Sequence, residues 1–217
     1  MSKLAAVTLT ALLAGAALGG PSLAQAPAGG PPAAPAAPPP ISKDPTTLAA
    51  GTYNIDLNHS SVIARIGHGR GISFSTLRFG VTKAVLTWDT NPANIKLEAT
   101  IDTKPHYDPI VYRGPPEGEN FLNVAKFPTA TYVSTGVTRT GPSKADVQGN
   151  LTLLGVTKPV TLHLELLGAT KTNQGAPIAG FTGTAELKRS DFGNTSFAGN
   201  VGDVVTLQLD GEFVKAN

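Results

Sequence analysis

Apolar and polar residues alternate with a period of two along much of the chain from Gly51 onward. The alternation is clearest in four segments: 95–102, 160–167, 181–188 and 205–210. A period of two is typical of β-strands that bury one face and expose the other. Five further segments have the composition of strands: 52–56, 61–67, 77–89, 129–137 and 147–154. Together these patterns predict about eight or nine strands.

Turn signals separate the predicted strands, and no amphipathic helix lies between them. Gly and Pro mark the turns, for example at 139–142 and 172–177. Strands of this spacing without intervening helices favour an antiparallel barrel or sandwich over an α/β fold. Only Pro105–Lys126 interrupts the pattern. We expect a long excursion there, with a short helix around Glu119–Ala125.

The N-terminal residues have the pattern of a secretory signal peptide. Lys3 is followed by the small and apolar run Leu4–Leu18 and then by helix-breaking Gly and Pro. The small residues at 22–26 fit a signal-peptidase site, with cleavage after Ala24 preferred over Ala26. The run is shorter than the roughly 20 residues of a membrane span, which argues against the alternative of an anchor. The sequence thus predicts a signal peptide at 1–24, a periplasmic protein and no stable membrane insertion.

Residues 25–50 are dominated by Ala, Pro and Gly. Nine of the 18 prolines of the 217-residue chain fall between Pro21 and Pro45. Such a composition favours an extended polyproline conformation and a disordered tether. Residues 51–217 are then expected to form one domain, long enough to bury roughly 70% of its unfolded surface without a disulfide.

Charge and cysteine content exclude several classes of function. The chain has 17 Lys and Arg against 15 Asp and Glu, a formal net charge of +2, and no clustered basic stretch. A nucleic-acid partner would require such a cluster, so none is expected. The chain has no Cys, which excludes disulfides, thiolate metal sites and cysteine nucleophiles.

No catalytic motif stands out among the remaining residues. The chain lacks G-x-S-x-G and H-E-x-x-H, and its four histidines are scattered. His59 and His68 could lie at a barrel rim as ordinary polar residues or, less simply, serve as a metal ligand or base. Arg189-Ser190-Asp191 is more simply explained by local hydrogen bonds at a turn. We therefore expect no catalytic residue, no metal site and no cofactor.

Four groups of residues carry a family resemblance: His59-Ser60-x-Val62-x-Ala64-x-Ile66-x-His68 followed by Phe79; Phe121-Leu122-Asn123-x-Ala125-Lys126-x-Pro128-x-Ala130-Thr131; Val147-x-Gly149-Asn150-Leu151-Thr152-Leu153-x-Gly155-Val156-Thr157-Lys158-Pro159-Val160; and Arg189-x-Asp191-Phe192-Gly193 with Val201-Gly202-Asp203. They follow one another in order over Gly51–Val214 and resemble the signatures of the YceI-like proteins. The resemblance implies an elongated, eight-stranded, antiparallel, lipocalin-like β-barrel. It also implies export to the periplasm and binding of a polyisoprenoid or quinone-type lipid in an apolar lumen.

The alternation and the resemblance together indicate which side chains would line that lumen. The candidate ligand-binding residues are Val62, Ala64, Ile66, His68, Phe79, Leu97, Ala99, Ile101, Phe121, Phe127 and Tyr132. The aromatic members lie near the excursion and could cap the opening. Alternation alone does not separate a cavity from a solid core, although an eight-stranded barrel can hold a slender ligand.

Three functions follow as hypotheses. The first is a periplasmic carrier that sequesters an isoprenoid or similar hydrophobic small molecule. The second is a binding module for another amphiphile, such as a fatty acid or amide, in envelope stress. The third is a lipid-modifying enzyme, which would need a nucleophile or metal that the sequence does not supply. The oligomeric state stays open, with a dimer among the options.

Overall fold

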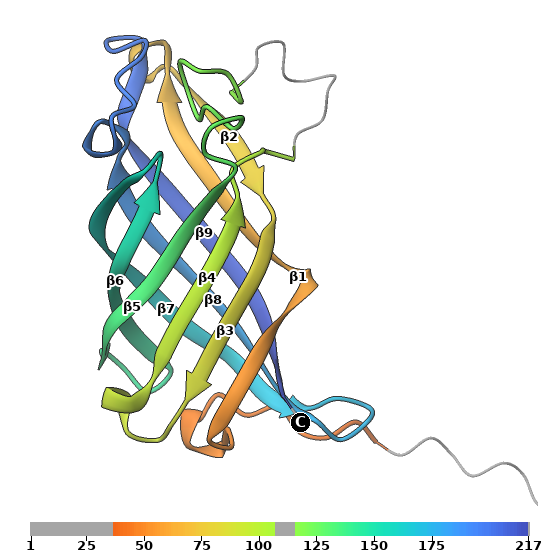
Figure 1. Cartoon of the computed structure of the whole chain (residues 1–217). Helices are drawn as coiled ribbons and strands as arrows, with labels where there is room; N and C mark the ends of the chain where they lie inside the picture. Colours follow the sequence, from red (N-terminus) through yellow and green to blue (C-terminus); the bar gives the residue numbers. More distant parts are fainter. Residues whose placement is uncertain (1–36, 107–115, 217) are drawn as a thin grey trace, which may run out of the picture. The chain divides into compact units, whose positions relative to one another are not determined.

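One antiparallel sheet closes on itself to form a barrel in the computed structural model, which describes residues 37–106 and 116–216 (Figure 1). The strands are β1 (Gly51–His68), β2 (Ser73–Phe79), β3 (Val81–Trp88), β4 (Lys96–Asp102), β5 (Thr129–Arg139), β6 (Lys144–Leu153), β7 (Val156–Lys171), β8 (Pro177–Lys188) and β9 (Val201–Lys215). Within the described residues the only helices are four short 3-10 turns: η1 (Pro45–Thr47), η2 (Gly69–Gly71), η3 (Pro92–Asn94) and η4 (Arg189–Phe192). The predicted all-β barrel is confirmed.

The pairing of β1 explains how nine strands make an eight-stranded barrel. Each strand from β3 to β9 pairs with its neighbour in sequence, and β1 pairs with β9 to close the ring. On its other side β1 pairs with β3 through Gly51–Asn54 and with β2 through Val62–His68. β2 and β3, which Gly80 separates, therefore lie one after the other along the same side of β1. Together they fill one position in the ring, so nine strands form an eight-stranded barrel.

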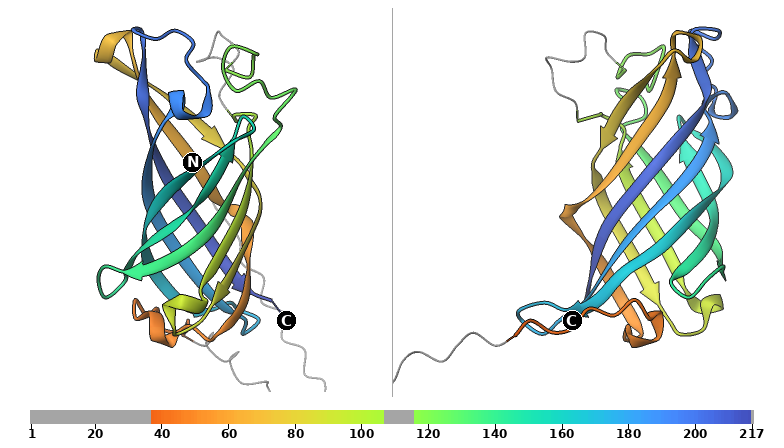
Figure 2. Two further views of the ribbon diagram at one scale, coloured as in Figure 1. Left: turned by 60° about the vertical axis from the view of Figure 1, so that its left-hand side comes forward. Right: turned by 180° about the vertical axis from the view of Figure 1, so that it is seen from behind.

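The two ends of the barrel differ in their connections (Figure 2). We call one the packed end, where the start of β1, the β3–β4 connection and the end of β9 meet. We call the other the loop end, which carries the β1–β2 turn, the excursion after β4 and the β8–β9 connection. No helix in the described ranges has the length and hydropathy of a transmembrane span.

The segment before β1 differs from the predicted tether. Residues 1–36, with the predicted signal peptide and the start of the tether, lie outside the described residues. Ser42, however, forms a two-way backbone bridge with Ala169 of β7, and Leu48 is 2% exposed. The hydroxyl of Tyr53 donates to the carbonyl of Ala49. The part from Ser42 to Ala50 therefore packs on the barrel, because Pro45 and Leu48 supply the apolar contacts that its composition had not suggested.

The excursion also differs from prediction. No helix forms around Glu119–Ala125, where the backbone makes a succession of turns. The amides of Phe121 and Asn123 both donate to the carbonyl of Gly118, and Asn123 has a φ of 44°. A residue with positive φ interrupts the regular i to i−4 bonding of an α-helix, so the segment turns back on itself instead.

Candidate functional site

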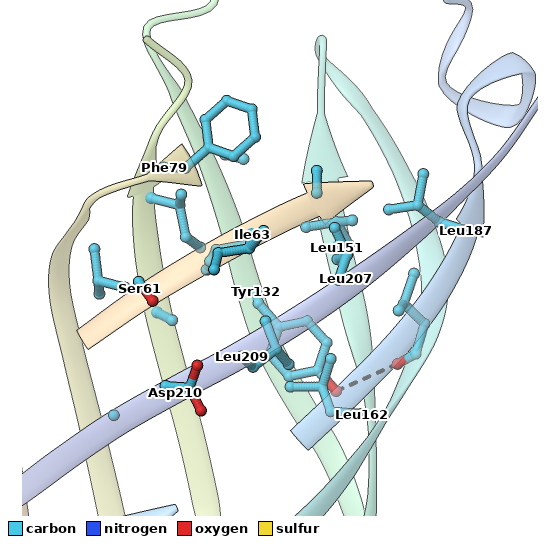
Figure 3. Close-up of a pocket in the computed structure, with 18 of the residues that line it drawn as sticks. Ser61, Ile63, Phe79, Tyr132, Leu151, Leu162, Leu187, Leu207, Leu209 and Asp210 are labelled. Atoms are coloured by element: carbon cyan, nitrogen blue, oxygen red, sulfur yellow. Dashed lines mark hydrogen bonds between the residues drawn. The ribbon is translucent and has the colours of Figure 1, made fainter. Parts of the chain in front are cut away.

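The barrel encloses a cavity of about 1400 Å³ (Figure 3). Typical small-molecule pockets measure about 300–1000 Å³, so this one can hold a large ligand. Its wall consists mainly of inward-facing aliphatic side chains, such as Leu97, Leu162, Leu164, Leu207 and Leu209. These five remain only partly buried, whereas side chains in a filled core would be excluded from solvent. The interior is therefore a cavity and not a solid core.

Ten of the eleven candidate ligand-binding residues line this cavity. β1 contributes Val62, Ala64, Ile66 and His68; β2 contributes Phe79; β4 contributes Leu97, Ala99 and Ile101; the excursion contributes Phe121, and β5 contributes Tyr132. Phe127 is not among the lining residues; its ring lies against Gly155 at the β6–β7 turn. Contact of these side chains with a ligand stays a prediction.

Tyr132 does not cap the opening as expected, because it is built into the wall. Its side chain is 4% exposed, and its hydroxyl donates to the carbonyls of Val147 (2.8 Å) and Val160 (3.3 Å). Burial raises the pKa of this phenol well above its ordinary value. Any side chain at Gly149 would collide with the Tyr132 ring, so the glycine of the sequence motif makes room for the phenol. Tyr132 thus joins β5, β6 and β7 instead of offering a polar group to a ligand.

Arg189 organises the loop end. It is 6% exposed, and its guanidinium donates to the carbonyls of Asn194, Ser196, Val201 and Gly202 at 2.7–3.1 Å. These acceptors all belong to the β8–β9 connection or to the first residues of β9. A buried guanidinium is stable only when its donors are satisfied. Arg189 therefore fixes the path of this connection, as expected for local hydrogen bonds at a turn.

The β8–β9 connection in turn holds the excursion in place. The side-chain amide of Asn194 donates to the carbonyl of Phe121 (3.1 Å), and the rings of Phe121 and Phe197 stack with centroids 5.1 Å apart. Ser190 donates to Asp203 from both its backbone amide and its hydroxyl, which lowers the pKa of that carboxyl. Hydrogen bonds and ring stacking therefore hold the rim of the cavity together at the loop end.

Aromatic rings fill the packed end. The ring centroid of Phe181 lies 6.3 Å from that of Trp88 and 6.0 Å from that of Phe213. The rings of Phe181 and Phe213 meet edge to face. Tyr53 and Leu48 are buried in the same cluster. The indole Nε1 of Trp88 is buried and has no hydrogen-bond partner among the described residues. This end holds together by apolar packing, and it forms the floor of the cavity.

The wall of the barrel is interrupted beside β1. Residues 56–59 bulge out of the β1–β9 ladder, because Ile55 pairs with Phe213 while Ser60 pairs with Gly211. In the bulge, Nδ1 of His59 lies 2.9 Å from Oδ2 of Asp56 and 3.9 Å from Glu212. The hydrogen bond to Asp56 raises the pKa of His59. These three side chains have the types of metal ligands, and their ligand atoms lie within 4.8 Å of one another at exposed or partly exposed positions. An ion pair between His59 and Asp56 is sufficient to explain the cluster.

His68, the other histidine considered for a metal or base, lies at the far end of β1. Its Nδ1 is 3.5 Å from the hydroxyl of Ser73, and eight residues of β1 lie between it and His59. At about 3.3 Å per residue these two rings are well apart. The structure therefore does not bring the two histidines together.

The lining of the cavity includes exposed residues in two regions. At the loop end its lining includes Phe74 and Phe197, both 55% exposed. Beside the β5–β6 turn it includes the exposed residues Arg139, Pro142 and Lys144. The loop end therefore offers a ligand an apolar entrance, whereas the lining beside the β5–β6 turn is polar and basic.

Sequence reasoning missed several wall and rim residues. Leu162, Leu164, Leu207 and Leu209 stand at inward positions of segments that the alternation had identified, so the same pattern could have found them. Asn194 and Phe197 gave no comparable signal, and Arg189 was predicted only to make local hydrogen bonds at a turn. Their roles depend on how the β8–β9 connection folds over the barrel end.

Comparisons with known proteins agree with this architecture. The family model of the YceI-like domain matches residues 53–213. A UPF0312 protein of Pseudomonas paraeruginosa is 40% identical over 175 residues, which is 76% of this chain and 88% of the relative. Protein YceI of Salmonella newport is 38% identical over 176 residues, 78% of this chain and 90% of the relative.

Solved structures show the same fold. BcnA of Burkholderia cenocepacia superposes with a TM-score of 0.58 at 24% identity, over 73% of this chain and 98% of that one. A polyisoprenoid binding domain from Saccharophagus degradans superposes with a TM-score of 0.52 at 12% identity, over 77% and 100%. The family model covers most of the barrel, and the relatives match over most of their own length. The chain therefore belongs to the YceI-like family.

Proposed function

We propose that the protein binds one slender, apolar chain of the polyisoprenoid type in its lumen and carries it through the periplasm. The observation that carries the proposal is the large aliphatic cavity, whose inward-facing leucines stay partly exposed. The structural likeness to a polyisoprenoid binding domain is consistent with it. The role is binding, and no step of catalysis is proposed.

The polar groups of the wall favour recognition by apolar burial. The hydroxyl of Tyr132 and the guanidinium of Arg189 are already bonded to backbone carbonyls. A ligand therefore gains its affinity from its own carbon chain. Each buried CH₂ contributes about 0.8 kcal/mol, so a five-carbon isoprene unit contributes about 4 kcal/mol. Four units give about 16 kcal/mol, which offsets an association cost of about 8 kcal/mol and leaves micromolar binding.

The periplasmic location belongs to the same proposal. Its support is the sequence of residues 1–24, with one basic residue, an apolar run and small residues before the cleavage site. A periplasmic carrier must hide an apolar chain from water while it crosses between membranes. An enclosed barrel with an opening at its loop end suits that task.

Native mass spectrometry of the protein mixed with geranylgeraniol, a 20-carbon polyprenol, tests this function. We expect one bound molecule per chain at micromolar concentration. Palmitate serves as the comparison, because its ionised carboxylate would lose hydration in a lumen whose wall is mainly aliphatic. Equal or tighter binding of palmitate would favour a fatty-acid carrier, and absence of a geranylgeraniol adduct would refute the proposal.

A further inference from the structure

Several large apolar side chains are exposed at the loop end of the barrel. Ile72, just after the β1–β2 turn, is 88% exposed, and Phe74 and Phe197 are each 55% exposed. The amide of Arg70 in the β1–β2 turn donates to the carbonyl of Asn200 (3.3 Å), so this turn and the β8–β9 connection adjoin (Figure 2). Isolated exposed apolar residues are ordinary, but exposed apolar residues around an opening mark an interaction site.

The charged residues of the β1–β2 hairpin that carries Ile72 and Phe74 have one sign. From Leu57 to Trp88 the chain contains Arg65, Arg70, Arg78 and Lys83 but no Asp or Glu. The guanidinium of Arg65 lies 3.5 Å from the centroid of the Phe74 ring. The carboxylate of Asp203, which lines the same small surface pocket as Arg70, is held by Ser190. The loop end therefore combines exposed apolar side chains with the arginines of the β1–β2 hairpin.

Exposed apolar residues with flanking arginines are suited to the interface of an anionic bilayer. Apolar and aromatic groups enter the headgroup region, while guanidinium groups stay among the phosphates. The lining beside the β5–β6 turn has basic residues but no large exposed apolar side chain among its described members. The chemistry therefore distinguishes the loop end as the end that faces lipid.

We propose that the loop end docks reversibly on an anionic lipid bilayer, with Ile72 at the headgroup level and Arg65 and Arg70 against the phosphates. Docking there places the apolar entrance of the cavity over the membrane in which isoprenoid lipids dissolve. The purpose of docking rests on the proposed function, but the surface itself does not depend on a ligand in the lumen. The proposed docking is a peripheral contact, and the protein does not insert into the bilayer.

The chain has no cysteine, so a single label can report which end meets the membrane. Ile72→Cys carries an environment-sensitive NBD fluorophore at the loop end. Ile41→Cys, at a residue 72% exposed near the packed end, is the matched control. With vesicles of phosphatidylcholine containing phosphatidylglycerol, the emission of the label at position 72 should shift to the blue, and that at position 41 should not. No shift at position 72, or an equal shift at position 41, would overturn the proposal.

A second variant tests the charge contribution. Arg65→Gln with Arg70→Gln should weaken binding to these anionic vesicles by about fivefold for each arginine, and raised salt should weaken the wild type similarly. Neither residue lines the lumen cavity, so geranylgeraniol binding in vesicle-free solution should be unchanged. Lost vesicle binding with intact geranylgeraniol binding separates docking from the proposed function. Unchanged vesicle binding in the double variant would contradict the electrostatic part of the proposal.

Discussion

At the packed end the rings of Trp88, Phe181 and Phe213 fill the space between the strands, whereas at the loop end hydrogen bonds hold the connections and the space stays open. Both ends are made by the same alternating strands. The difference lies in the size of the inward side chains and in the length of the connections. We therefore expect stability to depend mainly on the packed end and ligand binding on the open part of the lumen.

Small inward-facing side chains keep the middle of the lumen open. Ala99 of β4 pairs across the sheet with Ala84 and Tyr132, and it lines the cavity. A small side chain at this inward position leaves space beside a wall of leucines. The packed end leaves no such space, because its aromatic rings meet one another.

The largest effect should come from filling the lumen. Ala99→Trp places a ring where a ligand would lie, and loss of about five CH₂ contacts, about 4 kcal/mol, should weaken geranylgeraniol binding about 1000-fold. The free energy of unfolding should fall by less than the roughly 1–3 kcal/mol that is typical of overpacking a filled core. Native mass spectrometry measures the adduct. Ala93→Trp, at an exposed position, is the control and should bind normally.

Truncation of one aromatic ring at each end compares the two ends directly. Phe213→Ala should lower the free energy of unfolding by about 3–5 kcal/mol, because Phe213 is 8% exposed within the aromatic cluster. Phe197→Ala removes a half-exposed ring stacked on Phe121 and should cost about 0.5–1.5 kcal/mol. Urea denaturation measures both. Equal losses would show that the loop end is packed as firmly as the other.

Gly149→Ala should have a smaller but definite effect, about 1–3 kcal/mol of destabilisation. The added methyl group would meet the Tyr132 ring and, at 2.7 Å, the carbonyl of Val133, which cannot move freely in the sheet. Gly180→Ala is the matched control, because its nearest neighbour would be a side-chain carbon of Glu212 at 4.0 Å. Thermal unfolding of the two variants distinguishes them; similar melting temperatures would mean that Tyr132 is not fixed as described.

The smallest effect should be the pH dependence of the β1 bulge. The hydrogen bond to Asp56 raises the pKa of His59, so the stability that it contributes is complete below the ordinary histidine pKa of about 6.5 and is lost as pH rises through the raised value. The same contact lowers the pKa of Asp56, so its contribution is lost as pH falls through that lowered value. His59→Gln should flatten both slopes slightly in melting curves recorded from acid to neutral pH. A wild-type curve identical to that of the variant would show that the pair is not formed.

The fold and the strands of the lumen could be predicted well from the sequence. A period of two identifies which residues share a face, so the pattern alone assigns Val62, Ala64 and Ile66 to one side of β1. Gly149 belongs to a motif that carries the family resemblance. The reason for a glycine there is that a larger side chain would collide with Tyr132, and this depends on the register of β5 against β6.

The features that could not be predicted depend on contacts between distant segments. Phe127 and Tyr132 look alike in sequence as large groups near the excursion, yet one lies against Gly155 and the other bonds across three strands. Ser42–Ala50 resembles a tether in composition, but Ser42 meets Ala169 of a distant strand. Local patterns do not contain such pairings, and they give no measure of cavity volume.

A crystal structure of the protein grown with geranylgeraniol tests the central claim most directly. We expect continuous electron density for one extended chain inside the barrel, in contact with Leu97, Leu162 and Leu207 and absent from Ala99→Trp crystals. Density confined to the outer surface, or a lumen closed by inward movement of those leucines, would contradict the claim.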